Sequence, residues 1–184
     1  MVEVRPLGLD GLFEICPRRL VDERGFFSET WNEAALREAG ISVPFVQDNH
    51  SLSSARGTLR GLHFQAPPSA QAKLVRVSKG SIFDVAVDLR AGSTTFRKWA
   101  GIILSAAAWN QLLIPVGFAH GFLTLEPDTE VQYKASAPYS PADDRAIRFD
   151  DPGLAIDWPL HASELILSNR DRTAPLLAEM DTGF

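Results

Sequence analysis

The sequence predicts a mainly β protein, one domain over residues 1–184, built as a jelly-roll β-barrel. First, 12 prolines and 13 glycines are spread along the 184 residues and divide them into many short segments, which is typical of β-sandwiches and barrels. Second, the clearest pattern in the chain alternates between apolar and polar residues, as a strand does. Third, only two short stretches look helical, and no internal repeat or linker interrupts the chain.

The first element with clear end signals is one short N-terminal helix at residues 33–39. Asn32 can accept hydrogen bonds from the free backbone N–H groups of the first turn. Gly40 can adopt the left-handed conformation that commonly ends a helix. A second helical turn is expected near the C-terminus, at residues 175–179.

The strand pattern is clearest at residues 73–89, which Lys79-Gly80 divides into two halves. In its second half, alternate residues from Phe83 to Leu89 form an apolar face, whereas Asp84 and Asp88 lie on the opposite face.

Four more strands follow, at residues 99–104, 111–115, 121–125 and 130–135. The last two flank a Pro-Asp turn, which predicts that they form a β-hairpin.

Together the strands place the barrel core at about residues 45–137. Residues 138–184 are rich in Asp, Pro and Arg, and we expect them to wrap around the barrel as loops.

Composition narrows the class of function. The formal net charge is −5, which disfavours a nucleic acid polymer as partner. Cys16 is the only cysteine, so no internal disulfide can form. The N-terminal residues lack the pattern of a secretion signal, and no apolar run approaches the roughly 18 residues that span a membrane. We therefore expect a cytoplasmic protein without membrane contact.

His63 is the first candidate for chemistry. A single histidine between apolar neighbours is more often a structural residue than a catalytic one. Here, however, Arg60 and Lys73 are close in sequence, and buried cations are costly without a partner. An anionic ligand near His63 would explain both cations.

His120 and Tyr133 are weaker candidates from the residues alone. Each shares a strand face with apolar residues. His120 can line a ligand site or pack in the core, and a barrel tyrosine such as Tyr133 is most often a core residue with its hydroxyl satisfied.

A metal centre of the cupin type is disfavoured. That site pairs His-x-His with a glutamate and a later histidine, but here the first motif is His63-Phe64-Gln65, and no nearby glutamate completes it. His120 does fit the later motif. With half of the ligands missing, we expect no metal and no other cofactor. Phosphate-binding loops, dinucleotide fingerprints and nucleophile elbows are also missing from the sequence.

Nine segments together resemble the dTDP-4-dehydrorhamnose 3,5-epimerase family, in the family's order and over nearly the whole chain. They are RGFF (24–27), QDNHS (47–51), GTLRGLHFQ (57–65), QAKLV (71–75), FDVAVDLR (83–90), PVGFAHGF (115–122), YK (133–134), DPGLAIDWP (151–159) and LSNRD (167–171). The last segment departs from the family in carrying arginine where lysine is usual.

The resemblance implies a cupin-like jelly-roll fold and a cofactor-free reaction on a dTDP-sugar with a ketone at C4. dTDP-4-dehydro-6-deoxy-D-glucose would be inverted at C5 and C3, through an enolate, to dTDP-4-dehydro-L-rhamnose. By resemblance His63 is the base and Asp171 its orienting partner. Lys73 would stabilise the enolate, and Tyr133 would supply the proton to the opposite face.

The resemblance also implies substrate-binding residues. Arginines would meet the diphosphate, Asp84 and His120 would line the sugar pocket, Tyr139 would stack on thymine, and further polar residues would contact the nucleoside. The arginines are Arg24, Arg60 and Arg170, and the polar residues that would contact the nucleoside are Glu29, Gln47 and Asn49. The family implies a homodimer with an exchanged N-terminal segment, so that Phe27 or Glu29 would serve the neighbour's site.

Three alternatives stay open at this point. One is an epimerase that inverts only C3 or only C5 of a related dTDP-4-keto-deoxysugar. Another is a metal-dependent cupin enzyme, and the last is a sugar-binding barrel without catalysis.

Overall fold

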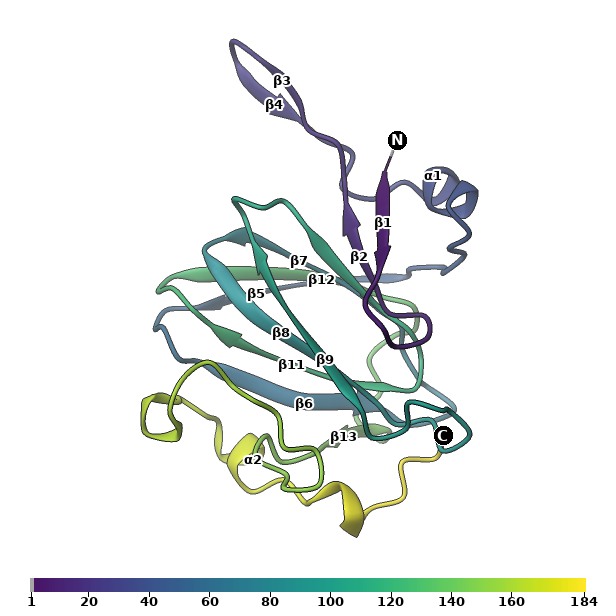
Figure 1. The fold of residues 1–184 in the computed structure, drawn as a ribbon, viewed down its shortest axis with the longest axis vertical. Coiled ribbons are helices and arrows are strands. Elements are labelled where there is room, and N and C mark those ends of the chain that lie inside the picture. Colours follow the sequence, from purple (N-terminus) through teal and green to yellow (C-terminus); the bar gives the residue numbers. More distant parts are fainter. Residues whose placement is uncertain (1) are drawn as a thin grey trace.

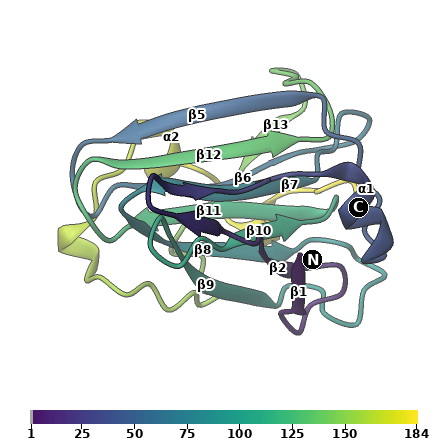
Figure 2. The same ribbon diagram turned by 90° about the horizontal axis from the view of Figure 1, so that it is seen from above.

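Two antiparallel sheets face each other in the computed structural model, which describes residues 2–184 (Figure 1). The six-stranded sheet has the order β1 (Glu3–Pro6), β2 (Phe13–Cys16), β10 (Gln111–Ile114), β7 (Lys73–Lys79), β12 (Thr129–Ala135) and β5 (Gln47–Ser53). The five-stranded sheet has the order β13 (Asp144–Ala146), β6 (Leu59–Gln65), β11 (Phe118–Thr124), β8 (Ser81–Asp88) and β9 (Trp99–Ser105). Figure 2 shows β5, β12 and β7 side by side. This arrangement confirms the predicted jelly roll.

The predicted N-terminal helix is confirmed as α1 (Glu33–Glu38), one residue shorter than expected. The Asn32 side chain accepts hydrogen bonds from the first-turn backbone, and Gly40 has a φ of +85°. The predicted C-terminal turn is a 3₁₀ helix, η2 (Leu177–Glu179). The helices η1 (Ala162–Glu164) and α2 (Asn169–Arg172) were not predicted. Within residues 2–184, no helix has the length and apolar character needed to cross a membrane.

The predicted strand segment at residues 73–89, divided at Lys79-Gly80, corresponds to β7 and β8, which lie in opposite sheets. Side chains on one face of β8, such as Ile82 and Ala86, join the apolar cluster between the sheets. Val85 and Val87 on the other face join a second cluster. Asp84 therefore lies on the face of β8 that looks into the barrel.

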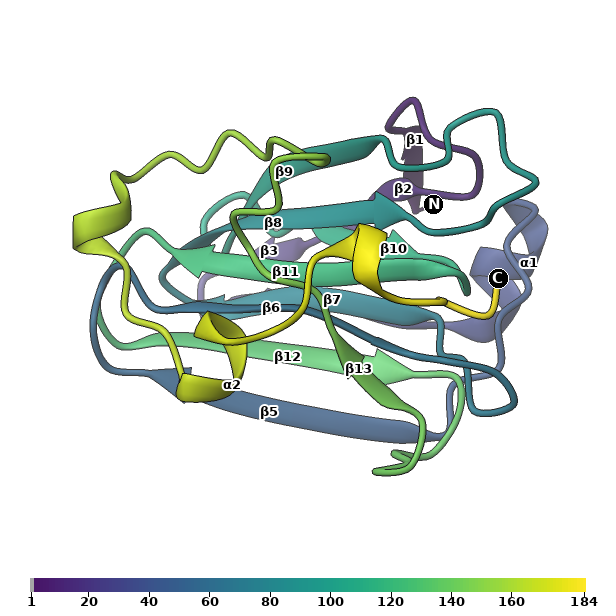
Figure 3. The same cartoon turned by 90° about the horizontal axis from the view of Figure 1, so that it is seen from below.

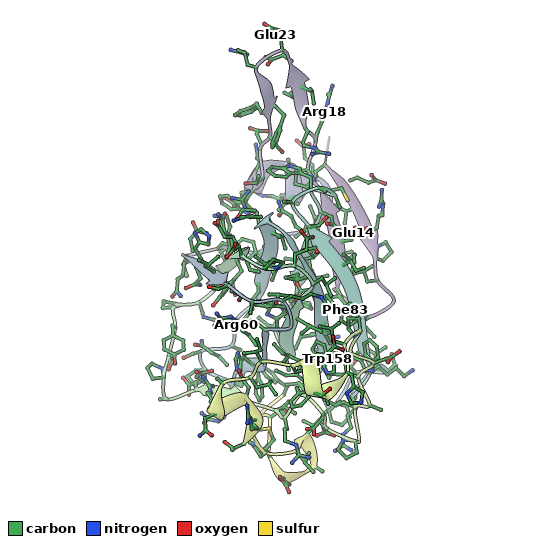
Figure 4. The ribbon with its side chains drawn as sticks, turned by 90° about the vertical axis from the view of Figure 1, so that its left-hand side faces the viewer. Glu14, Arg18, Glu23, Arg60, Phe83 and Trp158 are labelled. Atoms are coloured by element: carbon green, nitrogen blue, oxygen red, sulfur yellow. The ribbon has the colours of Figure 1, made fainter. Side chains whose placement is uncertain are left out.

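The second cluster lies beneath the C-terminal segment, which covers the outer face of the five-stranded sheet (Figure 3). Leu154 and Leu177 are buried there. The rings of Phe83 and Trp158 meet edge to face with centroids 6.0 Å apart (Figure 4). The loop-rich wrap that the sequence predicts is thus confirmed, and it builds a core of its own.

The predicted hairpin of residues 121–125 and 130–135 is wrong. These residues lie in β11 and β12, but β11 pairs with β6 and β8, whereas β12 pairs with β5 and β7. The reason is burial: every residue of β11 is buried, so this strand needs a neighbour on each edge inside the covered sheet. The Pro-Asp turn reverses the chain and leads it into the opposite sheet.

A two-stranded arm extends away from the barrel (Figure 1). It consists of β3 (Leu20–Asp22) and β4 (Gly25–Phe27), and Glu23 stands at its tip (Figure 4). Phe26 packs edge-on against Trp109, with ring centroids 4.7 Å apart. Phe27 is 65% exposed, so much of the arm's apolar surface is uncovered.

Candidate active site

The site is centred on a hydrogen-bonded pair, His63 and Asp171. Leu62 and Phe64 belong to the cluster beneath the wrap, so the alternation of β6 turns His63 toward the barrel interior. Its Nε2 atom lies 2.5 Å from Oδ1 of Asp171, on α2. The structure thus joins two predicted residues that are 108 positions apart in the sequence.

Asp171 is held in place from its other side. The Ser168 hydroxyl caps α2 by accepting the Asp171 N–H, and it donates to Oδ2 at 2.8 Å. Burial works to raise the pKa of Asp171, but hydrogen bonding and the charge of His63 outweigh burial, and the pKa lies below its ordinary value. Asp171 is therefore an ionised carboxylate, fixed to orient the imidazole.

Lys73, at the start of β7, lies next to this pair. Its Nζ atom donates to the backbone carbonyl of His63 at 3.5 Å and is 6.0 Å from the ring centroid of Tyr133, on β12. Burial lowers the pKa of Lys73 to about 8, although the charges of Asp144 and Asp84 oppose that change. Burial also raises the pKa of the Tyr133 hydroxyl, which therefore keeps its proton at neutral pH.

These groups border a cavity of about 210 Å³. Its lining consists of His63, Phe64, Gln65, Gln71, Lys73, Tyr133, Tyr139, Asp144 and Arg170. An imidazole, an ammonium and a phenol thus face one space, with a carboxylate behind the imidazole. This set can remove a proton, stabilise an oxyanion and return a proton.

Behind the cavity lies a second histidine–carboxylate pair. His120 Nε2 is 2.5 Å from Asp84 Oδ1, and His120 is the direct register partner of His63 on the neighbouring strand. Asp84 is fully buried, and its Oδ2 atom has no hydrogen-bond partner among residues 2–184. Burial lowers the pKa of His120, partly offset by Asp84. The role of both residues as lining of the sugar pocket stays a prediction.

A chain of polar contacts holds the mouth of the cavity. The Tyr139 backbone N–H donates to Gln47 Oε1, and the Gln47 amide donates to Asn49 Oδ1, both at 2.9 Å. The Tyr139 hydroxyl donates to Asp144 Oδ2 at 2.9 Å, and Arg170 donates to the same oxygen at 2.8 Å. Four predicted binding residues, Gln47, Asn49, Tyr139 and Arg170, therefore meet at one edge of the site.

Asp144 is a site residue that the sequence analysis missed. It is the first residue of β13 and directly follows Asp143, and nothing in the local sequence pattern separates the two carboxylates. Only the pairing of β13 with β6, which sets Asp144 opposite Gln65, directs one of them toward the cavity.

Other predicted residues lie outside the cavity lining. Arg60 donates to Ser53 Oγ at 3.3 Å at the side of the barrel (Figure 4). Arg24 pairs with Asp22 on the arm, while Phe27 ends the arm and Glu29 follows it. Within one subunit none of these four residues lines the cavity beside His63.

Gln65, the third residue of the His63-Phe64-Gln65 motif, forms hydrogen bonds with the protein backbone. The Gln65 amide donates to the backbone carbonyls of Ser69, at 2.6 Å, and Pro138, at 3.2 Å. In the described part of the chain, no group of three or more His, Cys, Asp or Glu side chains is arranged to hold a metal ion. Independence from metals stays a prediction.

Comparison with known proteins adds to this geometry. A sequence model of the dTDP-4-dehydrorhamnose 3,5-epimerase family matches residues 6–179. The chain belongs to this family. A dTDP-4-dehydrorhamnose 3,5-epimerase from Pseudomonas aeruginosa is 52% identical over 171 residues, 92% of each chain. The family assignment makes the chain an isomerase of the epimerase type.

Solved structures of other epimerases have the same fold. The dTDP-6-deoxy-D-glucose-3,5-epimerase of Legionella pneumophila, in complex with dTDP-4-keto-L-rhamnose, superposes with a TM-score of 0.93. It is 44% identical, and the match covers 98% of this chain and 95% of that one. A 3'-monoepimerase from Streptomyces bikiniensis, in complex with dTDP-quinovose, gives a TM-score of 0.87 at 35% identity, covering 95% and 87%.

Proposed function

We propose that this epimerase converts dTDP-4-dehydro-6-deoxy-D-glucose to dTDP-4-dehydro-L-rhamnose by inverting C5 and C3. One observation carries the proposal: His63, hydrogen-bonded to Asp171, lines the same cavity as Lys73 and Tyr133. Base, cation and acid can therefore act on one bound sugar.

The reaction needs no redox partner, because the C4 ketone makes the neighbouring protons acidic. His63 takes the C5 proton, the C–H electron pair forms a C4–C5 double bond, and the carbonyl electrons move to O4. The Lys73 ammonium stabilises this enolate. Tyr133 then donates its proton to the opposite face of C5, and the ketone re-forms. Exchange with solvent restores both residues, and the same sequence at C3 completes the conversion.

The rest of the substrate would occupy the mouth of the cavity. The Arg170 guanidinium suits the diphosphate oxygens, with Arg60 and Arg24 as further candidates. The exposed Tyr139 ring would stack on thymine, and Gln47 and Asn49 would contact the nucleoside. The bound dTDP-sugar of the Legionella pneumophila epimerase supports this class of ligand.

The direct test is incubation with dTDP-4-dehydro-6-deoxy-D-glucose in D₂O, followed by NMR. Deuterium at both C5 and C3, with both centres inverted, is the expected result. Absence of label at either carbon with active protein contradicts the double epimerisation.

A second candidate is an epimerase that inverts a single centre of a dTDP-4-keto-deoxysugar. The similarity to the Streptomyces bikiniensis 3'-monoepimerase over 95% of this chain favours it. The same NMR experiment separates the two, because a single-site enzyme inverts only one carbon.

We further propose a homodimer in which each arm serves the neighbour's site. An isolated two-stranded ribbon is at best marginally stable in water, and Val21 on this one is 77% exposed. A second barrel covering the arm would remove that surface from water and bring Phe27 and Glu29 to the partner's cavity.

A further inference from the structure

Asp144 is out of place in a cavity for a nucleoside diphosphate. Among the described residues that line the cavity, it is the one carboxylate. The negative charge of Asp144 repels phosphate oxygens. Asp144 can therefore favour binding of a nucleoside diphosphate only if it holds other groups in place whose attraction for the ligand exceeds this repulsion.

The contacts of Asp144 provide that arrangement. The side chain is 13% exposed, and its Oδ2 atom accepts both the Tyr139 hydroxyl and the Arg170 guanidinium. Each of those side chains is otherwise half exposed to solvent. A single oxygen thus fixes an aromatic ring and a cation that would sample many conformations without it.

Asp144 is itself firmly placed. β13 pairs with β6 so that Asp144 lies opposite Gln65 and Ala146 lies opposite His63. Arg170 precedes Asp171 on α2. The Asp144–Arg170 ion pair therefore links the strand beside the base to the helix that carries the partner of that base.

We propose that Asp144 is a positioning residue that holds Tyr139 and Arg170 in the geometry that binds the nucleoside diphosphate. The proposal rests on the proposed function, because it takes dTDP as the recognised part of the substrate. It gives the carboxylate a net favourable effect on affinity despite its negative charge.

Calorimetric titration with dTDP tests this with Asp144→Asn, which keeps the shape and removes the charge. Loss of charge-assisted hydrogen bonds predicts a rise in Kd of about tenfold or more. KM for the sugar nucleotide should rise with it, while kcat at saturation stays near the wild-type value. Unchanged or tighter dTDP binding would mean that repulsion dominates, and the inference would be wrong.

Asp143→Asn is the matched control. Asp143 accepts hydrogen bonds from the hydroxyls of Ser69 and Ser140 and does not line the cavity, so its variant should bind dTDP as the wild type does. If D144N folds poorly, Asp144→Glu keeps the charge and displaces the oxygen, and it should also weaken binding. Wild-type affinity from this variant would refute the positioning role.

A double-mutant cycle gives a readout that general damage to the fold would not imitate. Tyr139→Phe alone should weaken dTDP binding, but it should have a smaller effect in the D144N background, since the hydrogen bond to residue 144 has already lost its charge assistance. Fully additive effects would contradict positioning through Asp144. Failure of the wild type to bind dTDP at all would instead refute the proposed function.

Discussion

At the scale of single residues, two groups that line the cavity, His63 and Tyr133, differ in their surroundings. The imidazole of His63 is backed by a fixed carboxylate, whereas the phenol of Tyr133 is partly desolvated and keeps its proton. Inversion of a carbon requires that one group removes a proton and another group returns it to the opposite face. The difference between these two environments supports the proposed roles of His63 as base and Tyr133 as acid.

Tyr133→Phe should separate proton exchange from inversion. The substitution keeps the ring but removes the dissociable proton, while His63 and Lys73 remain to form the enolate. Deuterium should still enter from D₂O, whereas net inversion, above all at C5, should collapse. NMR of the product for label and configuration measures both.

Tyr139→Phe is the control for this split, since it removes a hydroxyl at the mouth of the same cavity. It should slow label uptake and inversion in parallel at low substrate concentration. Wild-type inversion by Tyr133→Phe would show that Tyr133 is not the acid and would make His120 the next candidate.

Lys73 should set the alkaline limit of activity. The enolate needs the ammonium form, and burial lowers the pKa of Lys73 to about 8. The charged fraction therefore falls as the pH rises through that value, and kcat/KM should fall with it. Lys73→Arg keeps its charge to far higher pH, so the alkaline limb should move upward even if the rate at neutral pH is lower. If the alkaline fall of kcat/KM occurs at the same pH in the Lys73→Arg variant, another group is responsible for that fall.

At the scale of elements, the C-terminal wrap carries Asp171, the partner of His63, and it also packs a core of its own. Leu154 is 5% exposed in the cluster beneath it, so Leu154→Ala should lower the free energy of unfolding by about 2–5 kcal/mol. Ile166→Ala, at a wrap side chain that is 49% exposed, should change it by less than about 0.5 kcal/mol. Urea unfolding compares the two, and equal losses would contradict a packed second core.

The sequence predicts the positions of helices and strands better than it predicts which strands pair with one another. Alternation and end signals are local, so β8 and α1 could be placed from their own residues. The assignment of β11 and β12 to different sheets depends on which strands lie beside them in space, and a Pro-Asp turn carries no information about that. Likewise, the outer face of β8 is buried by residues such as Leu154 and Trp158 of the C-terminal wrap, which come some 70 positions later in the chain.

The candidate site shows the same difference between local signals and contacts of distant segments. His63 and Lys73 were suspected from their own neighbourhood, because a histidine with nearby cations is unusual in a core. Asp171 entered only through resemblance to a family, since no spacing rule joins residues 108 positions apart. Asp144 was missed because its role depends on the pairing of β13.

At the scale of the whole molecule, the proposed exchange of arms would account for two features of one subunit. The arm exposes Val21 and Phe27, and its base lies next to an apolar groove that contains Ile15, Trp31 and Leu36. The cavity in turn lacks Phe27 and Glu29, which the family resemblance assigns to it. Exchange of arms between two copies would satisfy both needs, and light scattering at micromolar concentration should then give the mass of a dimer.

Mixed dimers give the sharpest test of that exchange. His63→Ala destroys the base in its own barrel but leaves a normal arm. A subunit with Phe27→Ala and Glu29→Ala has a normal barrel but a defective arm. If each arm serves the neighbour, a dimer of these two has one intact site, formed by the normal arm on the normal barrel. Co-expression with two affinity tags isolates that species, and it should recover activity that both parent variants lack. If each arm served its own barrel, both sites of the mixed dimer would be defective, and the mixture would stay as inactive as its parents.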